Sequence, residues 1–394
     1  VAISSDRVEP ELLHYLDPSW QSIIAGDIDG ANSEPYKIDQ NAPNLNRYSA
    51  TRRVARTVFM GTAPHHDQEN KGLDDKQINL GVVQPGEKIA IFGDALRRLA
   101  NQAKFMHGDL GRYWYSMSAS LNRTAADRAG QLEDALVRAE IDKALTTYMN
   151  GLADRGHFDA VQVAPENSSE VPDEPGGVRA VILGVSYSHT GRDGSDAMEE
   201  INDIYLQRGN SPRVYRNTLI FIAPEYRLLE NLELAMRSSI AWNEVVRDAE
   251  SGRLNLRSSD IALAKSKAKE AGDTTQTRLK EAWSYVVYPY QDTPQSDVAF
   301  TSAKVPAQDG ILARASKKLV SDGALLAEIG PDNLNRNLTK YIWNDKEHLQ
   351  LRDLWEYLNR YTYLPRLKGR ETLINAVQSA VSGMLPGPFG YAER

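Results

Sequence analysis

The fold of the central part of this chain is decided by one apolar stretch, Val178-Arg-Ala-Val-Ile-Leu-Gly-Val185, whose β-branched residues predict a buried strand. Residues 158–163 and 217–223 have the same character and are also expected to be strands. Helices are predicted over residues 195–207 and 226–249, after the second and third strands. This alternation predicts a right-handed βαβ unit, and hence a parallel sheet with helices on its faces.

The amino-terminal part predicts a winged helix, a variant of the helix-turn-helix motif. Apolar residues recur at helical spacing over residues 48–60 and over residues 89–102. A hairpin should follow, because residues 104–107 and the aromatic run Arg112-Tyr-Trp-Tyr-Ser-Met117 flank a glycine-containing turn at residues 108–111.

The remaining segments are expected to be mainly helical. Long helices are predicted over residues 125–150 and 258–286, and shorter ones over residues 347–359 and 371–382. Residues 361–365 predict a bend, because the residue before a proline disfavours helix.

The predicted fold class is therefore α/β plus α, in three parts. Residues 1–150 would form a winged-helix-like domain with its preceding and following helices. Residues 151–300 would form a βαβ domain with long helices, and residues 301–394 a helical region. Loops or domain joints are expected in three polar zones that contain proline or glycine: residues 61–76, 164–177 and 289–309.

The composition is typical of a soluble globular protein. Of 394 residues, 41% are hydrophobic and 25% charged, and 46 Lys+Arg against 53 Asp+Glu give a net charge of −7. The absence of cysteine excludes disulfides, thiolate metal sites and a cysteine nucleophile. No apolar stretch approaches the ~20 residues of a spanning helix, so we expect no membrane partner and a cytoplasmic location. The chain starts with valine and shows no signal peptide, which predicts a fragment of a longer polypeptide.

The sequence holds no complete active site, so whether the chain itself is an enzyme is left open. It has neither a Gly-x-x-x-x-Gly-Lys-Ser/Thr loop nor a Gly-x-Gly-x-x-Gly helix start, and it should not hydrolyse nucleotides by itself. Gly184-Val-Ser-Tyr-Ser188 resembles the elbow of a serine hydrolase but ends in serine instead of glycine, and no catalytic residue is assigned. A ligand site at this strand end is the favoured alternative, with the candidate residues Ser186, Ser188, His189 and Thr190.

No metal site is predicted. His65 and His66 with Asp67 and Glu69 are interpreted as a solvated loop, because adjacent ligands seldom converge on one ion without partners elsewhere.

A basic segment points to a polyanion. Residues 43–128 contain 13 Lys+Arg and 8 Asp+Glu inside an acidic chain, which favours nucleic acid, most simply DNA, as a partner. The alternative is a winged helix that binds only protein. Nucleic-acid contacts are predicted for residues of the second helix and the hairpin: Arg97, Arg98, Lys104, Arg112 and Tyr113.

The densest basic run, which includes Arg52, Arg53 and Arg56, has three interpretations. These arginines could contact phosphate, complete a nucleotide site of a neighbouring subunit in trans, or form a salt-bridged helix face.

Several blocks of the sequence resemble one protein family. They are Arg52-Arg-Val-Ala-Arg-Thr-Val-Phe-Met-Gly61, Gly111-Arg-Tyr-Trp-Tyr-Ser-Met-Ser-Ala-Ser-Leu-Asn-Arg-Thr-Ala-Ala-Asp-Arg128, Tyr215-Arg-Asn-Thr-Leu-Ile-Phe-Ile-Ala-Pro224 with Ala241-Trp242, Tyr363-Leu-Pro-Arg-Leu367 and Phe389-Gly-Tyr-Ala392. In order and spacing they are similar to the carboxy-terminal portion of the prokaryotic AAA+ ATPases of the domain of unknown function 499 family.

The resemblance implies a function that this chain does not perform alone. Family members carry a phosphate-binding loop nearer their amino terminus, so ATP and Mg²⁺ would bind the ATPase half of the same polypeptide. The genes lie beside those of DNA methylases and helicases in clusters implicated in defence against phage, which makes such proteins expected partners. The resemblance therefore implies that this region couples ATP hydrolysis to DNA or partner binding. A pure protein–protein scaffold is the alternative, and a serine hydrolase a remote one.

Overall fold

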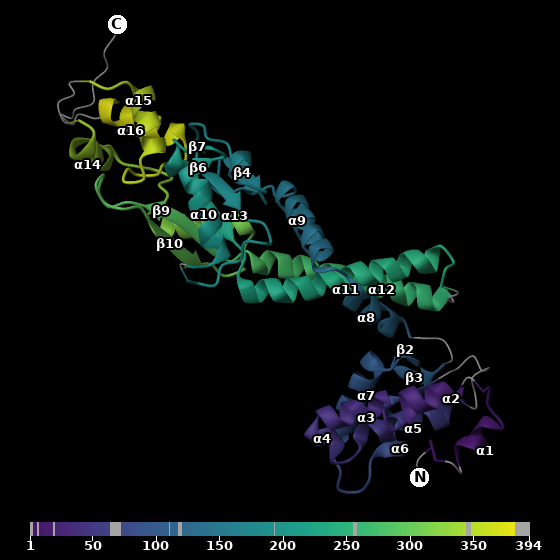
Figure 1. Cartoon of the computed structure of the whole chain (residues 1–394). Helices are drawn as coiled ribbons and strands as arrows, with labels where there is room; N and C mark the ends of the chain where they lie inside the picture. The colour runs from purple at the N-terminus through teal and green to yellow at the C-terminus, as the bar shows by residue number, and fades with distance from the viewer. Residues whose placement is uncertain are drawn as a thin grey trace. The chain divides into compact units, whose positions relative to one another are not determined.

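The computed structural model describes residues 3–5, 8–18, 20–63, 72–109, 111–116, 120–192, 194–254, 258–343 and 348–382. The zone containing His65 and Glu69 and the terminal block at residues 389–392 lie outside these residues. The protein is a mixed α/β structure with many helices (Figure 1). Its internal contacts define two compact units: unit 1 is Val1–Leu132 with Ser238–Lys269, and unit 2 is Glu133–Arg237 with Glu270–Arg394.

The core of unit 1 is built around helix α5 (Ala50–Thr62). The buried side of α5 includes Val54, Val58 and Phe59, and the Phe59 ring packs 5.5 Å from that of Trp20. The helix predicted at residues 48–60 is thus confirmed with a shift of two residues. Shorter elements precede α5: α1 (Glu9–Leu13), α2 (Trp20–Ile23), the π-helix η1 (Ile24–Ile28), α3 (Glu34–Asn41) and α4 (Pro43–Asn46).

Two helices and a small antiparallel sheet follow α5. In chain order these elements are β1 (Leu73–Asp74), α6 (Asp75–Val82), α7 (Ile89–Gln102), β2 (Met106–Asp109) and β3 (Arg112–Tyr115). The sheet has the order β1-β3-β2. Helix α7 has the predicted bounds, whereas β1 and α6 were not predicted. Their signal is a capping box, in which the Asp74 carboxylate accepts the Gln77 N–H (2.8 Å) and the Gln77 side chain accepts the Asp74 N–H (3.0 Å).

The single helix predicted over residues 125–150 is wrong. The backbone is extended at Leu132 and Glu133, with ψ angles of 132° and 140°, and it separates α8 (Leu121–Gln131) from α9 (Asp134–Asn150). Gly130 weakens the end of α8, and Asp134 in the first turn of α9 favours a new start there.

Unit 2 contains a five-stranded sheet with the order β10-β9-β8-β5-β4. The three predicted strands pair in parallel, as expected: β4 (Ala160–Val163), β5 (Arg179–Ile182) and β8 (Leu219–Ala223). Two antiparallel strands, β9 (Tyr285–Tyr290) and β10 (Ala299–Lys304), make the sheet mixed and occupy residues predicted as helix end and loop. Pro289 fits in β9 because β8 pairs only with residues 285–287 of that strand.

Both faces of the sheet are covered. Val181 and Phe221 point to the face that packs against α10 (Asp196–Leu206), which lies between β5 and β8 in the chain. Ile182 and Ile222 alternate to the opposite face and are also fully buried. A short antiparallel pair is formed by β6 (Gln207–Arg208) and β7 (Ser211–Pro212). Two 3₁₀ turns, η3 (Ser168–Glu170) and η4 (Arg216–Thr218), also belong to this part of the chain.

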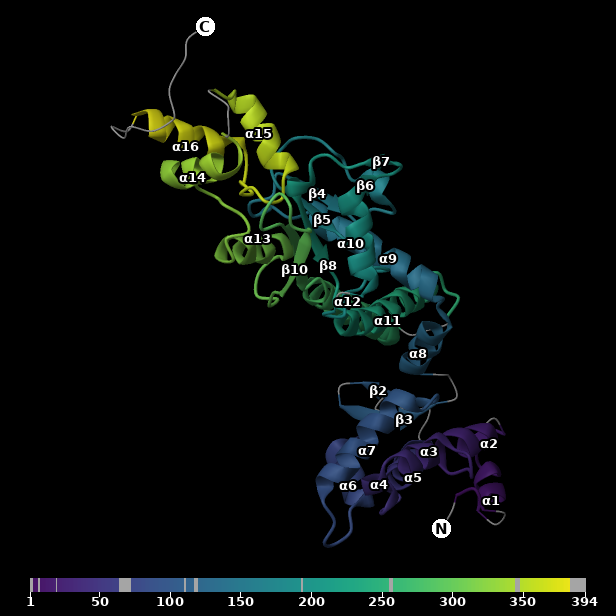
Figure 2. The ribbon, with the colours of Figure 1, turned by 60° about the vertical axis from the view of Figure 1, so that its left-hand side comes forward.

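Two long helices connect β8 to β9. They are α11 (Tyr226–Glu250) and α12 (Ser258–Ala282), each of 25 residues, which run side by side in both views (Figure 2). By their contacts, residues 238–269 group with unit 1 and the remaining residues of both helices with unit 2.

The carboxy-terminal part of unit 2 is helical, as predicted. It contains α13 (Ile311–Ser321), α14 (Pro331–Tyr341), α15 (Leu351–Arg360) and α16 (Arg370–Ser382). Leu338, Leu358 and Leu373 lie in a separate apolar core that the last three of these helices share.

Candidate functional site

Helix α7 carries the most accessible of the predicted nucleic-acid contacts. The Arg97 and Arg98 side chains are 74% and 48% exposed, and both pair with the Asp94 carboxylate one turn earlier, at 3.4 and 3.0 Å. Lys104 lies exposed just after the helix, with its ammonium 5.4 Å from the centre of the Phe105 ring. All three cations are accessible to a polyanion, because ion pairs between exposed side chains, such as those with Asp94, are weak.

The two predicted contacts on the hairpin have other partners. The Arg112 guanidinium donates to the Gly72 carbonyl at 2.7 Å and so ties β3 to the segment before β1. Tyr113 is half-buried, and burial together with the nearby Asp75 carboxylate raises its pKa. Both side chains therefore contribute to the packing of the small sheet.

The amino-terminal half of α7 is apolar rather than basic. Ile89 in its first turn is 60% exposed, and Leu80 on α6 is 88% exposed. In helix-turn-helix proteins the first turns of the second helix contact base edges through hydrogen-bonding side chains. Ile89 and Ala90 have no such groups, so this surface suits phosphate contact at its carboxy-terminal end and apolar contact at its start.

The positive charge of residues 43–128 is largely offset within unit 1. Residues 1–42 carry eight Asp+Glu and two Lys+Arg. Among those acids, Asp39 lies 3.5 Å from the Arg52 guanidinium and Asp29 pairs with Arg56. Among the predicted nucleic-acid contacts, the exposed positive charge that could attract a polyanion is therefore limited to Arg97 and Arg98 on α7 and to Lys104, fewer residues than the sequence indicates.

The three arginines on α5 all bind neighbouring residues. Arg52 donates to the Ser49 hydroxyl at 2.8 Å in addition to its pairing with Asp39. Arg53 holds both oxygens of Glu87, at 2.9 and 3.0 Å, and thereby lowers the pKa of that carboxyl. Arg56 pairs with Asp29. This arrangement matches the salt-bridged interpretation of the run, and an arginine acting in trans would first have to break one of these pairs.

The predicted ligand loop follows β5. Ser186 and Thr190 are exposed, whereas Ser188 and His189 are buried. The Gly191 N–H donates to His189 Nδ1 at 2.7 Å, which places the ring proton on Nε2, 3.1 Å from the hydroxyl of Ser302 on β10. A general base needs a ring nitrogen whose lone pair can take the proton of the serine. The lone pair of Nδ1 accepts the Gly191 N–H and Nε2 carries the ring proton, so this arrangement does not activate a serine.

The strand order of the sheet does not favour a ligand crevice at the carboxyl end of β5. Ligands of open α/β sheets bind where the strand order reverses. Here the five strands follow one another across the sheet in chain order, so the described strands contain no such reversal.

The sequence did not predict a carboxyl group, that of Asp142, which lies beside the chain that follows β5. Asp142 on α9 accepts the Val185 N–H at 2.9 Å, and burial raises its pKa. A Cβ at Gly184 would lie 3.5 Å from both Asp142 oxygens, which is ordinary van der Waals contact, so this position of the carboxylate does not require glycine. Nothing in the sequence around Asp142 points to this position, because the contact joins segments 43 residues apart.

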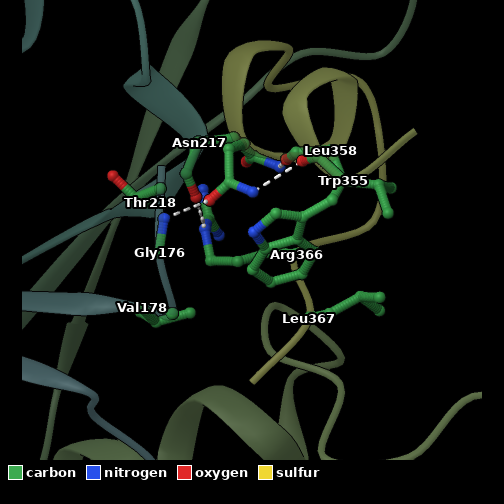
Figure 3. Close-up of a pocket in the computed structure, with 10 residues that line it drawn as sticks. Gly176, Val178, Asn217, Thr218, Trp355, Leu358, Arg366 and Leu367 are labelled. Carbon is green, nitrogen blue, oxygen red and sulfur yellow. Dashed lines mark hydrogen bonds between the residues drawn. The ribbon is translucent and has the colours of Figure 1, made fainter. Parts of the chain in front are cut away.

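The cavity drawn in Figure 3 is a structural joint. It has a volume of about 10 Å³, room for one water molecule, and lies where η4, just before β8, meets α15. Arg366 is buried and donates to the carbonyls of Asn217 (2.7 Å), Ala324 (3.0 Å) and Pro289 (2.8 Å). Asn217 in turn donates to the Leu358 carbonyl at 2.8 Å. The blocks at residues 215–224 and 363–367, which the sequence singled out separately, therefore meet here.

The described residues contain no group of three or more His, Asp or Glu side chains placed to hold a metal ion. Within the same residues, no helix is both long and apolar enough to span a bilayer. Comparison of the chain with family models, curated proteins and solved structures gave no match.

Proposed function

We propose that residues 50–115 form a winged helix that contacts the phosphate backbone of duplex DNA. The order of helix, strand, helix, helix and hairpin, with the sheet order β1-β3-β2, supports this assignment. The observation that carries the function is the exposed pair Arg97 and Arg98 on α7. With few hydrogen-bonding groups at the start of α7, the contact would be largely independent of base sequence.

The wider role follows from the resemblance. This chain would be the carboxy-terminal portion of a AAA+ ATPase of the domain of unknown function 499 family, and it would couple ATP hydrolysis in the other half of the polypeptide to DNA or to a partner protein, in defence against phage. The lack of a phosphate-binding loop in the sequence supports this division of labour.

A mobility-shift titration of duplex DNA at several salt concentrations tests the DNA contact. We expect Arg97→Glu with Arg98→Glu to weaken binding at least tenfold and to flatten the dependence on salt, because two phosphate contacts are lost. The matched control is Arg253→Glu with Lys265→Glu, which reverses two exposed cations elsewhere in unit 1 and should change binding little. Equal binding by wild type and the α7 variant would refute the proposal.

A second candidate, protein docking on the winged helix, is favoured by the exposed Leu80 and Ile89. Light scattering of the chain with and without the ATPase half would measure whether the winged helix mediates association. Leu80→Glu should then abolish association, whereas Leu234→Glu, at an exposed leucine of α11, should not. A chain that stays monomeric in both cases and still shifts DNA would reject docking.

A further inference from the structure

Four tyrosines form a continuous row in unit 2, which we call the tyrosine row. In spatial order they are Tyr341, Tyr363, Tyr361 and Tyr357, with neighbouring ring centres 5.3, 5.3 and 6.0 Å apart. The rings of Tyr361 and Tyr363 are stacked, at an interplanar angle of 23°. The row joins the end of α14, the last turns of α15 and the bend that follows α15.

The row is held in place by its surroundings. The Tyr341 hydroxyl donates to the Asp292 carbonyl at 3.1 Å, and Thr362, between the two stacked rings in sequence, donates to the Gln291 side chain at 3.0 Å. Tyr363 is half-buried, whereas Tyr361 is 41% exposed. A ligand would therefore meet aromatic surface whose orientation is fixed before binding, which lowers the entropic cost of association.

Cations flank the row. The Lys340 ammonium lies 4.6 Å from the centre of the Tyr341 ring, and Arg336 is exposed one turn earlier on α14. At the other end, Arg360 pairs with Glu356 at 3.3 Å and lies 5.6 Å from the centre of the Tyr215 ring. Aromatic rings beside positive charge are the two components by which proteins bind single-stranded nucleic acid without regard to sequence.

We propose that the tyrosine row is a stacking platform for unpaired bases of single-stranded nucleic acid, with Lys340 and Arg336 contacting its phosphates. Tyr361 is the most exposed residue of the row, at 41%, and is stacked on Tyr363 on one side, so a base would add to the stack at the exposed part of its ring. A proline-rich peptide fits the observations less well, because its docking on aromatic rings does not call for cations, whereas Lys340 and Arg336 lie beside the row. The proposal concerns a different unit and a different form of nucleic acid from the α7 contact, and neither depends on the other.

Fluorescence anisotropy of a labelled oligothymidine with the full chain tests the platform. We expect Tyr361→Ala to weaken binding about tenfold, the usual loss for one stacked base, and Tyr361→Phe to bind like wild type because the ring is kept. Lys340→Gln should reduce the slope of log affinity against log salt by close to one contact. The matched control is Tyr226→Ala, since Tyr226 is 50% exposed in the same unit but outside the row.

Each outcome decides the question. Binding by Tyr361→Ala within twofold of wild type would overturn the platform, as would an equal loss in Tyr226→Ala. Thermal unfolding of each variant shows whether the fold is kept, and Tyr361→Phe separates loss of the ring from loss of the hydroxyl. Binding of a proline-rich peptide with no binding of oligothymidine would also overturn the proposal. Each oligothymidine titration is repeated in the Arg97→Glu, Arg98→Glu background, which removes the proposed phosphate contacts of α7. A loss caused by Tyr361→Ala in that background belongs to the tyrosine row, so failure of the duplex contact can be told apart from failure here.

Discussion

Buried arginines in unit 2 bind carbonyl groups of the backbone. Arg213 donates to Ile204, Val171 and other carbonyls around the short β6–β7 pair, and Arg366 donates to three carbonyls at the start of β8 and its surroundings. Burial lowers the pKa of each guanidinium to about 10, which still leaves both charged at neutral pH. These side chains satisfy backbone groups that would otherwise be buried without a partner.

Replacing Arg366 should therefore be costly. We expect Arg366→Lys to lower the unfolding free energy of unit 2 by about 2–4 kcal/mol, because an ammonium cannot reach three divergent carbonyls and some are left unpaired. Urea unfolding followed by tryptophan fluorescence would measure the loss. Arg336→Lys, at an exposed arginine, should stay within about 0.5 kcal/mol of wild type; a similar cost at both positions would contradict the argument.

Asp27 should make unit 1 less stable as the pH rises. Its carboxylate accepts the Phe105 N–H at 2.5 Å, yet burial dominates and raises its pKa. A group with a raised folded-state pKa stabilises fully below its unfolded pKa of about 3.9, and loses that contribution as the pH rises through the folded value. Relative to Asp27→Asn, wild type should thus lose stability as the pH rises above about 4. Urea unfolding of both proteins at several pH values is the measurement, and a wild type that gains stability relative to Asp27→Asn as the pH rises would disprove the assignment.

Residue types and local charge were enough to select candidate binding side chains, but not to predict which residues these side chains pair with. The ion pairs of Arg53 and Arg56 span 34 and 27 residues, and the contact of His189 with Ser302 spans 113. Such pairings are set by how elements pack, which periodicity does not encode. Exposed residues such as Arg97 were easier to place, because α7 was predicted with its full length.

Elements with strong helical periodicity were the ones that sequence could predict. Helix α7 has its expected bounds, and α15 and α16 differ from expectation by a few residues. Strands β9 and β10 were missed because Pro289 and Pro294 indicate a loop. Residues 285–290 become a strand through pairing with β10 along their whole length and with β8 at residues 285–287. The break between α8 and α9 was missed because apolar spacing continues across Leu132.

The approach of α13 to the loop before β4 depends on a glycine. Gly156 has φ +60°, and a Cβ there would lie 2.6 Å from that of Ser316 on α13. Gly323, after α13, has φ +69° but open space around it. Both substitutions to alanine should cost about 1 kcal/mol for the left-handed backbone, and Gly156→Ala a further 1–3 kcal/mol for the displaced helix. Urea unfolding would compare the two variants, and equal costs would mean that α13 adjusts freely.

At the scale of the whole molecule, buried apolar residues form separate cores. One core lies in residues 3–115, one packs α10 against one face of the sheet, and one joins α14, α15 and α16. The sequence predicted a mixed α/β structure rich in helix, which the structure shows. It did not indicate that Ser238–Lys269 groups with Val1–Leu132, because contacts between segments so far apart leave no periodic pattern.

Damage to one core should accordingly remain local. Leu358→Ala removes a buried side chain from the last core, at an expected cost of about 2–5 kcal/mol. Hydrogen exchange read by mass spectrometry should accelerate in α14, α15 and α16 and stay unchanged in α5 and α7. Faster exchange in α5 would show instead that the cores unfold together.

The hydrogen bond from Arg366 to Asn217 spans 149 residues, and its consequence concerns protein synthesis. The ribosome releases β8 before it has translated Arg366. Until Arg366 emerges, the Asn217 carbonyl lacks this hydrogen-bond donor and stays hydrated. Closure of this joint is among the last steps that synthesis permits, because a contact of such sequence separation forms only after the intervening chain has emerged. A messenger that ends before the codon for Arg366 would thus yield a polypeptide with every described strand of the sheet but without the side chain that binds the Asn217 and Pro289 carbonyls.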